Sequence, residues 1–166
     1  MKKKQSQSGV FLLEALIAIL IFSLGILGMV AMGGTAIASQ SDAQFRTEAA
    51  NFASEIASKI ALNVDRANPA SVTNFAHLPV PGGYCNFAGS ASTNAVVLDW
   101  IDRVRGAVAG VPGLPGATNV SESIAVDTTP GSGFNRVTIT VCWKPPSTNA
   151  TPLAPWHRHV LVSYIN

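Results

Sequence analysis

GVFLLEALIAILIFSLGILGMVAMGGTAIA, residues 9–38, is the longest apolar stretch of this chain, and the remaining residues are best understood outward from it. Apart from small hydroxyl side chains it is apolar, and its only charged residue is Glu14. A helix rises about 1.5 Å per residue and the hydrocarbon core of a bilayer is about 30 Å thick, so about 20 residues are enough to cross it. The stretch therefore predicts a transmembrane helix over residues 10–38.

Residues 1–9, MKKKQSQSG, precede the predicted transmembrane helix and contain three lysines and no acid. The positive-inside bias predicts that they lie in the cytoplasm and that the chain from Ser39 onward lies across the membrane. A secretory signal peptide fits less well, because its apolar region is only about 7–15 residues long. A plain membrane anchor leaves Glu14 unexplained, since a carboxylate at the centre of a membrane helix costs about 2.5–3.5 kcal/mol and usually indicates a partner.

The length and net charge of the remaining chain limit the number of domains that it can form and the partners that it can bind by charge. The 166 residues leave room for one modest domain beyond the membrane segment. Three of the 11 Lys and Arg residues lie in residues 1–9. The remainder therefore contains eight basic and nine acidic residues, which gives it a net charge of −1. That remainder is not basic enough to bind nucleic acid by charge alone, and no nucleic-acid partner is implied.

The chain contains two cysteines, Cys85 and Cys142, both on the predicted far side of the membrane. An oxidising compartment allows them to pair, and their spacing does not match a CxxC motif. We therefore expect a structural disulfide rather than redox chemistry or a metal site.

Residues 39–66 change from apolar to amphipathic, without an obvious helix breaker after Ala38. The apolar residues recur at helical spacing, which predicts one buried stripe formed by Phe45, Ala49, Phe52, Ile56 and Ile60. Glu55 and Lys59 form an i, i+4 pair off that stripe. We expect one helix from Val10 to about Asp65, ending before Pro69.

Residues 67–166 are expected to form a head with an antiparallel sheet, giving an α+β fold in which the long helix packs on the sheet. Residues 68–89 are predicted to be a loop, 94–108 a helix, and 121–128, 134–143 and 156–165 strands, with a turn at 129–133 and an exposed loop at 144–155. In the middle strand, alternation predicts that one face is buried. The inward set is Val137, Ile139, Val141 and Trp143; the outward set is Arg136, Thr138, Thr140 and Cys142.

Motifs for catalysis are lacking in the sequence, and we expect neither a catalytic residue nor a cofactor. His157 and His159 are spaced so that they point the same way on a strand, but a metal site needs three or four converging ligands and the sequence supplies no clear third; the remaining histidine is His77. Asp99 and Asp102 are spaced i, i+3, which is more typical of a solvated helix face than of a carboxylate pair in an active site.

The segment Gly9-Val10-Phe11-Leu12-Leu13-Glu14 resembles the class III signal of type IV prepilins and pseudopilins: a short basic leader ending in glycine, then a hydrophobic residue, and glutamate at the fifth position after the glycine. The resemblance implies cleavage between Gly9 and Val10 by a prepilin peptidase, followed by N-methylation of Val10. It also implies that Glu14 neutralises the N-terminal amine of a neighbouring subunit during assembly. Val10 departs from the phenylalanine most common at the first mature position.

The chain resembles most closely the PilV-type branch of the minor pilins, through its apolar run, Asp99-Trp100 and the strand sequence ITVCW at residues 139–143. This resemblance implies a cleaved leader (1–9), a fibre-core helix (10–38), an amphipathic helix (39–66) and a periplasmic or extracellular head (67–166). The expected partners are the major pilin, other minor pilins, the peptidase and N-methyltransferase, and the inner-membrane assembly platform. The expected location is the inner membrane before assembly and the pilus afterwards. A type II secretion pseudopilin and a membrane-tethered periplasmic binding domain are the alternatives.

Overall fold

The computed structural model describes residues 8–129, 135–146 and 155–165. The chain divides into two compact units, Met1–Ser41 and Asp42–Asn166, called here the N-terminal unit and the head unit. Helix α1, Ser8–Asn63, provides the described residues of the N-terminal unit, and its remaining turns belong to the head unit.

The N-terminal unit is a helix with an exposed apolar surface. Leu, Ile, Ala and Met are favourable or tolerated in helices, which accounts for helix formation despite four glycines. Every large apolar side chain described from Val10 to Ile37 is exposed, from 45% at Ile26 to 74% at Met29 and Met32. Among the described residues this is one helix long and apolar enough to cross a membrane, with a mean hydropathy of 2.8 in its most apolar window. This agrees with the predicted membrane segment.

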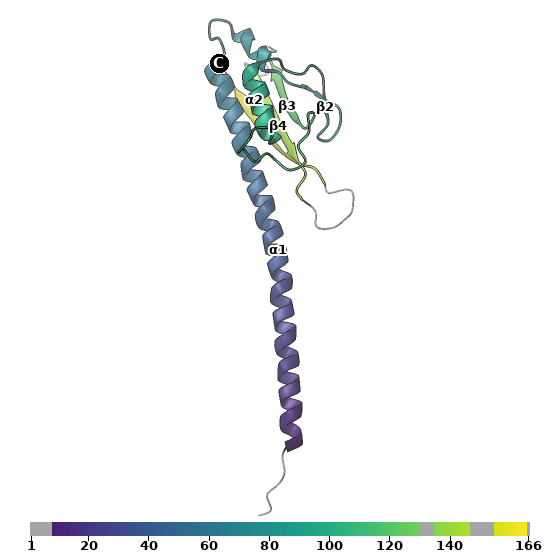
Figure 1. Ribbon diagram of the computed structural model, residues 1–166. Helices are drawn as coiled ribbons and strands as arrows, with labels where there is room; N and C mark the ends of the chain where they lie inside the picture. Colours follow the sequence, from purple (N-terminus) through teal and green to yellow (C-terminus); the bar gives the residue numbers. More distant parts are fainter. Residues whose placement is uncertain (1–7, 130–134, 147–154, 166) are drawn as a thin grey trace, which may run out of the picture. The chain divides into compact units, whose positions relative to one another are not determined.

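The head unit combines helices with a small antiparallel sheet (Figure 1). In chain order, after the last turns of α1, its elements are the 3₁₀ helix η1 (Pro69–Phe75), β1 (Val80–Pro81), β2 (Phe87–Ala88), α2 (Ala95–Val104), β3 (Glu122–Asp127), β4 (Arg136–Trp143) and β5 (His157–Tyr164). β4 lies between β3 and β5 and is antiparallel to both, and β1 pairs with β2 in a separate short ladder. The structure is therefore α+β with a long N-terminal helix, as the sequence predicts.

The buried stripe expected on the amphipathic part of α1 is confirmed. Ala49, Ile56 and Ile60 are fully buried, Phe52 is 6% exposed, and Phe45 is partly buried against the same core. These side chains join one cluster with residues of α2 and of the sheet, including Trp100, Val104, Val137, Ile139 and Val141. Burial of this apolar surface, at about 25 cal/mol per Å², is the main force that holds helix and sheet together.

Helix α2 is shorter than predicted, since it ends at Val104 and not near Val108. Gly106 adopts φ +70°, its amide donates to Arg103 O, and the amide of Ala107 donates to Asp102 O. This pair of hydrogen bonds is a Schellman motif, in which a left-handed glycine satisfies the last carbonyls of a helix. Gly106 was the signal for this helix end in the sequence.

The prediction that strand β4 buries only one face is wrong. Val137, Ile139, Val141 and Trp143 are buried as expected, but Thr140 and Cys142 on the opposite face are also buried. The segment that carries Cys85 covers that face, because a disulfide joins Cys85 to Cys142. The alternation of apolar and polar residues along one strand does not reveal that a loop distant in sequence packs on its second face.

Residues 68–89, predicted to be a loop, contain η1 and the β1–β2 pair. His77 extends the main sheet here, since its amide and carbonyl exchange hydrogen bonds with Ile124 on β3. The other element bounds agree with the predictions to within one or two residues, with α1 ending at Asn63 and β4 beginning at Arg136. The predicted leader (1–9), the turn at 129–133 and the loop at 144–155 lie largely outside the described residues.

Candidate functional site

The predicted processing and assembly residues lie in the first turns of α1. Gly9, Val10 and Glu14 all lie within the helix. Val10 and Glu14 are separated by four residues, which places them on the same side of the helix one turn apart. Val10 is 67% exposed and Glu14 is also exposed, so both are accessible on this helix surface.

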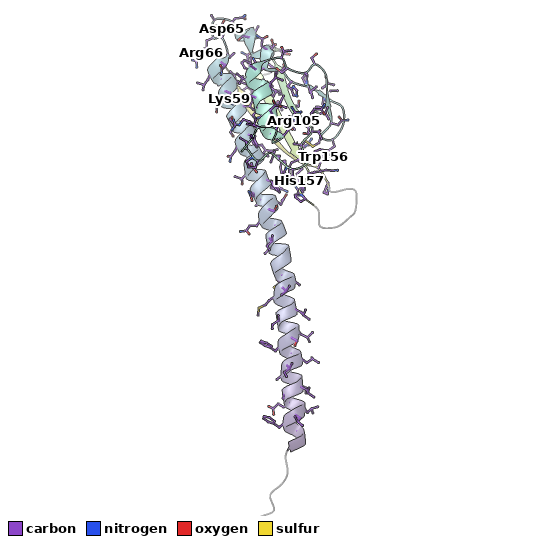
Figure 2. The ribbon with its side chains drawn as sticks, in the orientation of Figure 1. Lys59, Asp65, Arg66, Arg105, Trp156 and His157 are labelled. Atoms are coloured by element: carbon purple, nitrogen blue, oxygen red, sulfur yellow. A yellow bond between two sulfur atoms is a disulfide. The ribbon has the colours of Figure 1, made fainter. Side chains whose placement is uncertain are left out.

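This surface is continuous with the exposed apolar side chains of the N-terminal unit (Figure 2). Such a large apolar surface is unfavourable in water, so it requires lipid or another apolar helix around it. A β carbon added at Gly25, Gly28, Gly33 or Gly34 would meet nothing within 4 Å, so these glycines are not required by packing inside this chain. Glu14 is the single carboxylate on this surface, and in an apolar environment it requires a positive partner.

In the head unit, ion pairs join the amphipathic part of α1 to α2. Glu55 contacts both Lys59, at 3.0 Å, and Arg103, and Lys59 also lies 3.2 Å from Asp99. These side chains are partly exposed, so each pair contributes at most about 1 kcal/mol. Neighbouring residues form a shallow hollow with one cation and two carboxylates, lined by Glu48, Asn51, Phe52, Glu55, Arg103, Val111 and Pro112.

His157 is half-buried. Its Nδ1 atom lies 2.9 Å from Asp42 Oδ1, and its ring meets the ring of Trp143 edge to face with centroids 5.6 Å apart. Asp42 also accepts a 2.8 Å hydrogen bond from Arg46. The Arg46 guanidinium is the largest cause that holds the pKa of Asp42 below its usual range, with a smaller contribution from His157.

The structure contains a buried carboxyl group that the sequence did not single out. Glu122 on β3 is fully buried, Ser121 Oγ donates a 2.7 Å hydrogen bond to Oε1, and Oε2 has no hydrogen-bond partner among the described residues. Burial raises the pKa of Glu122 to about 7. The sequence places Glu122 in a predicted strand, but a lone acid among strand residues does not reveal that its side chain is fully buried.

His77 is a second buried ionisable group. Its Nδ1 accepts a hydrogen bond from the amide of Ser92, so the neutral ring carries its proton on Nε2. Burial, and next the positive charge of Arg105, lowers the pKa of His77. The positive charge of Arg105 also opposes the rise in the pKa of Glu122 that burial causes. Both buried groups therefore lie near Arg105, at the end of α2.

The other candidates from the sequence do not converge. Asp99 pairs with Lys59 and Asp102 pairs with Arg105, so each carboxylate has its own cation. Within residues 8–129, 135–146 and 155–165, no group of three or more His, Cys, Asp or Glu side chains is arranged to hold a metal ion. The Cys85–Cys142 disulfide is present, as expected from the sequence.

No protein-family model, no curated protein and no solved structure matches this chain.

Proposed function

We propose that this chain is a minor pilin, a low-abundance structural subunit that supports assembly of a type IV pilus and through it adhesion or twitching motility. The observation that carries the proposal is Glu14, alone on the exposed apolar surface of α1 and five residues after Gly9. In this proposal a prepilin peptidase cleaves between Gly9 and Val10, and the new amino terminus on Val10 is methylated.

Electrostatics supports a role for Glu14 in assembly. Cleavage creates an ammonium group on Val10, one helical turn from the carboxylate. Two such charges are costly in an apolar environment unless they are paired, and their attraction is strong where the dielectric constant is low. When the carboxylate of one subunit meets the amine of the next, both charges are compensated, and the pairing sets the register between helices.

The test is intact mass and N-terminal sequencing of the chain recovered from membranes and from sheared surface fibres. The proposal expects a chain that starts at methylated Val10 and is present in the fibres. A processed chain found only in membranes would instead support a type II secretion pseudopilin or an assembly primer. A chain that retains residues 1–9 in cells with active peptidase would leave a membrane-tethered domain and overturn the proposal.

The second arm of the test is Glu14→Gln, which removes the charge and keeps the shape. Processing is expected to continue, because the cleavage site is intact, while recovery in fibres falls by about tenfold or more, equivalent to a loss of about 1.4 kcal/mol per step. Ser23→Ala is the matched control, since Ser23 Oγ donates to Ile19 O within its own helix. Equal recovery of both variants would contradict the role of Glu14.

A further inference from the structure

Two pairs of a cation and an aromatic ring lie together at the end of the β4–β5 hairpin. Lys144 Nζ lies 5.4 Å from the centre of the Trp156 ring, and Arg158 Cζ lies 5.1 Å from the centre of the Tyr84 ring. Both distances are within the range of attractive cation–π contacts. Lys144, Trp156, Arg158 and Tyr84 are called here the cation–aromatic patch.

The strand register places Arg158 of the patch on the sheet face that carries the disulfide. Cys142 and Arg158 are direct partners in the β4–β5 ladder, which ends at the next pair, Trp143 and His157. Lys144 and Trp156 lie one residue beyond this last pair, outside the two strands, and are two residues along the chain from Cys142 and Arg158, respectively. Trp143 is buried in the core and lies on the opposite face.

The disulfide fixes the fourth member of the patch. Tyr84 precedes Cys85, which is bonded to Cys142, the ladder partner of Arg158. Tyr84 remains 58% exposed although its ring is positioned over the Arg158 guanidinium. A ring that is both exposed and held in place loses little conformational entropy when a ligand stacks on it.

Within residues 8–129, 135–146 and 155–165, no carboxylate lies within salt-bridge distance of the two cations of the patch. Five of the eight Arg and Lys residues described lie within salt-bridge distance of an Asp or Glu carboxylate: Arg46, Lys59, Arg103, Arg105 and Arg136. Within the described residues, Lys144 and Arg158 have no carboxylate partner and contact aromatic rings instead. The patch therefore presents two positive charges beside two planar apolar surfaces.

We propose that the cation–aromatic patch binds an acidic polysaccharide. The C–H faces of a sugar ring carry partial positive charge and stack on the sides of the exposed Tyr84 ring and the half-buried Trp156 ring that face away from the two cations, while Lys144 and Arg158 pair with sugar carboxylates. A polyanion as dense as nucleic acid fits less well, because it needs many cations and residues 10–166 carry a net charge of −1. A glycan with one carboxylate per sugar matches two cations and two rings. This inference does not depend on the proposed pilus function.

The experiment measures binding of a short oligogalacturonate to the full chain in detergent micelles, by titration of intrinsic tryptophan fluorescence. The two other tryptophans, Trp100 and Trp143, are buried, so a change on binding reports mainly on Trp156. Saturable binding is expected, and Arg158→Gln or Tyr84→Ala is expected to weaken it by about tenfold or more, the effect typical of residues at the centre of an interface. Isothermal calorimetry with the same probe gives a second readout that does not depend on the indole.

Matched controls lie elsewhere on the chain. Tyr164 is also 58% exposed but lies six residues along β5 from Arg158, roughly 20 Å at 3.3 Å per residue, so Tyr164→Ala should leave binding unchanged. Arg66→Gln removes an exposed cation far along the sequence from the patch and should also have no effect. Thermal melts of each variant verify that it is folded.

Several outcomes would overturn the proposal. They are the absence of saturable binding, equal binding of a neutral maltooligosaccharide, and an equal loss of affinity in Tyr164→Ala and Tyr84→Ala. Tighter binding of an oligothymidylate that is lost in Arg158→Gln would assign the patch to nucleic acid and also reject the glycan.

Discussion

The indole nitrogen of Trp100 donates a 2.9 Å hydrogen bond to the main-chain carbonyl of Phe52. Trp100 lies on α2 and is fully buried, and Phe52 lies on the amphipathic part of α1, so one side chain joins the two helices of the head unit through both packing and a polar contact. The N–H of a buried tryptophan usually finds an acceptor, and at Trp100 a helix carbonyl supplies it.

Trp100→Phe should therefore destabilise the head unit by about 1–3 kcal/mol, because it removes the hydrogen bond and leaves a small cavity. The measurement is chemical or thermal unfolding of the full chain in detergent. Leu98→Ala on the same helix is the control, since Leu98 is 44% exposed and should change stability by no more than about 0.5 kcal/mol. Equal effects of the two substitutions would show that burial of Trp100 does not hold α2 in place.

Because the pKa of Glu122 is raised, we expect the free energy of unfolding of the head unit to fall as pH rises. Burial raises its pKa to about 7 from an ordinary value of 4.5, so the folded state holds a proton that the unfolded chain has already released. The stabilising effect of that proton is complete below the unfolded pKa and is lost as pH rises through the folded one, a change on the order of 3 kcal/mol.

Glu122→Gln keeps the shape and the neutral state, so it should be more stable than the natural chain at about pH 8 and should lose this pH dependence. The measurement is unfolding at a series of pH values from about 5 to about 8. Glu48→Gln, at a half-buried position of α1, is the control and should keep the natural profile. An unchanged profile in Glu122→Gln would mean that another group causes the pH dependence.

Because the pKa of His77 is lowered, we expect this residue to make the free energy of unfolding fall as pH decreases. Because its folded pKa lies below the ordinary 6.5, the ring contributes stability above that value, which is lost as pH falls through the folded pKa. His77→Asn retains an acceptor for the Ser92 amide without a titrating ring, so the variant should lose less stability on acidification than the natural chain. Unfolding curves at about pH 7 and about pH 5 measure this difference, and equal losses would contradict it.

The Cys85–Cys142 disulfide closes a loop with a sequence separation of 57 residues. In the chain-entropy model, removal of a crosslink of this size costs about 4 kcal/mol. The double substitution Cys85→Ala and Cys142→Ala should lower the melting temperature accordingly and expose the covered face of β4 to hydrogen exchange at Thr140. A head unit whose stability is unchanged by the double substitution would contradict a structural role for the bond.

After α2 the backbone at Gly113 packs closely against the backbone at Gly106. A β carbon at Gly113 would lie 2.1 Å from the backbone nitrogen of Gly106, a contact that the backbone must move to relieve. Gly113→Ala should cost about 3 kcal/mol, at the upper end of overpacking effects. Gly110→Ala is the control, since Gly110 has a left-handed φ of +81° but open space, and it should cost only about 1–2 kcal/mol. A smaller cost at Gly113 than at Gly110 would contradict the packing argument.

Local patterns predicted most elements of the fold because each depends on neighbouring residues. The stripe from Phe45 to Ile60 follows the helical period, and the three strands of the main sheet follow a period of two. The same reasoning failed for the second buried face of β4 and for the strand-like segment around His77, because both depend on pairing with residues far away in sequence. The motif formed by Gly9, Val10 and Glu14, on which the proposed processing rests, is a local pattern that is visible in the sequence alone.

The sequence by itself determined the long apolar helix, the isolated carboxylate at Glu14, the amphipathic stripe and the α+β character of the rest. These features follow from hydrophobic periodicity and length, which are properties of a local stretch of chain. Only the tertiary structure decided that Glu122 is buried with a raised pKa, that Trp100 bonds to Phe52, and that Tyr84 and Arg158 meet. Burial and contact between distant residues arise when separate elements pack around one core, and no single stretch of sequence contains that information.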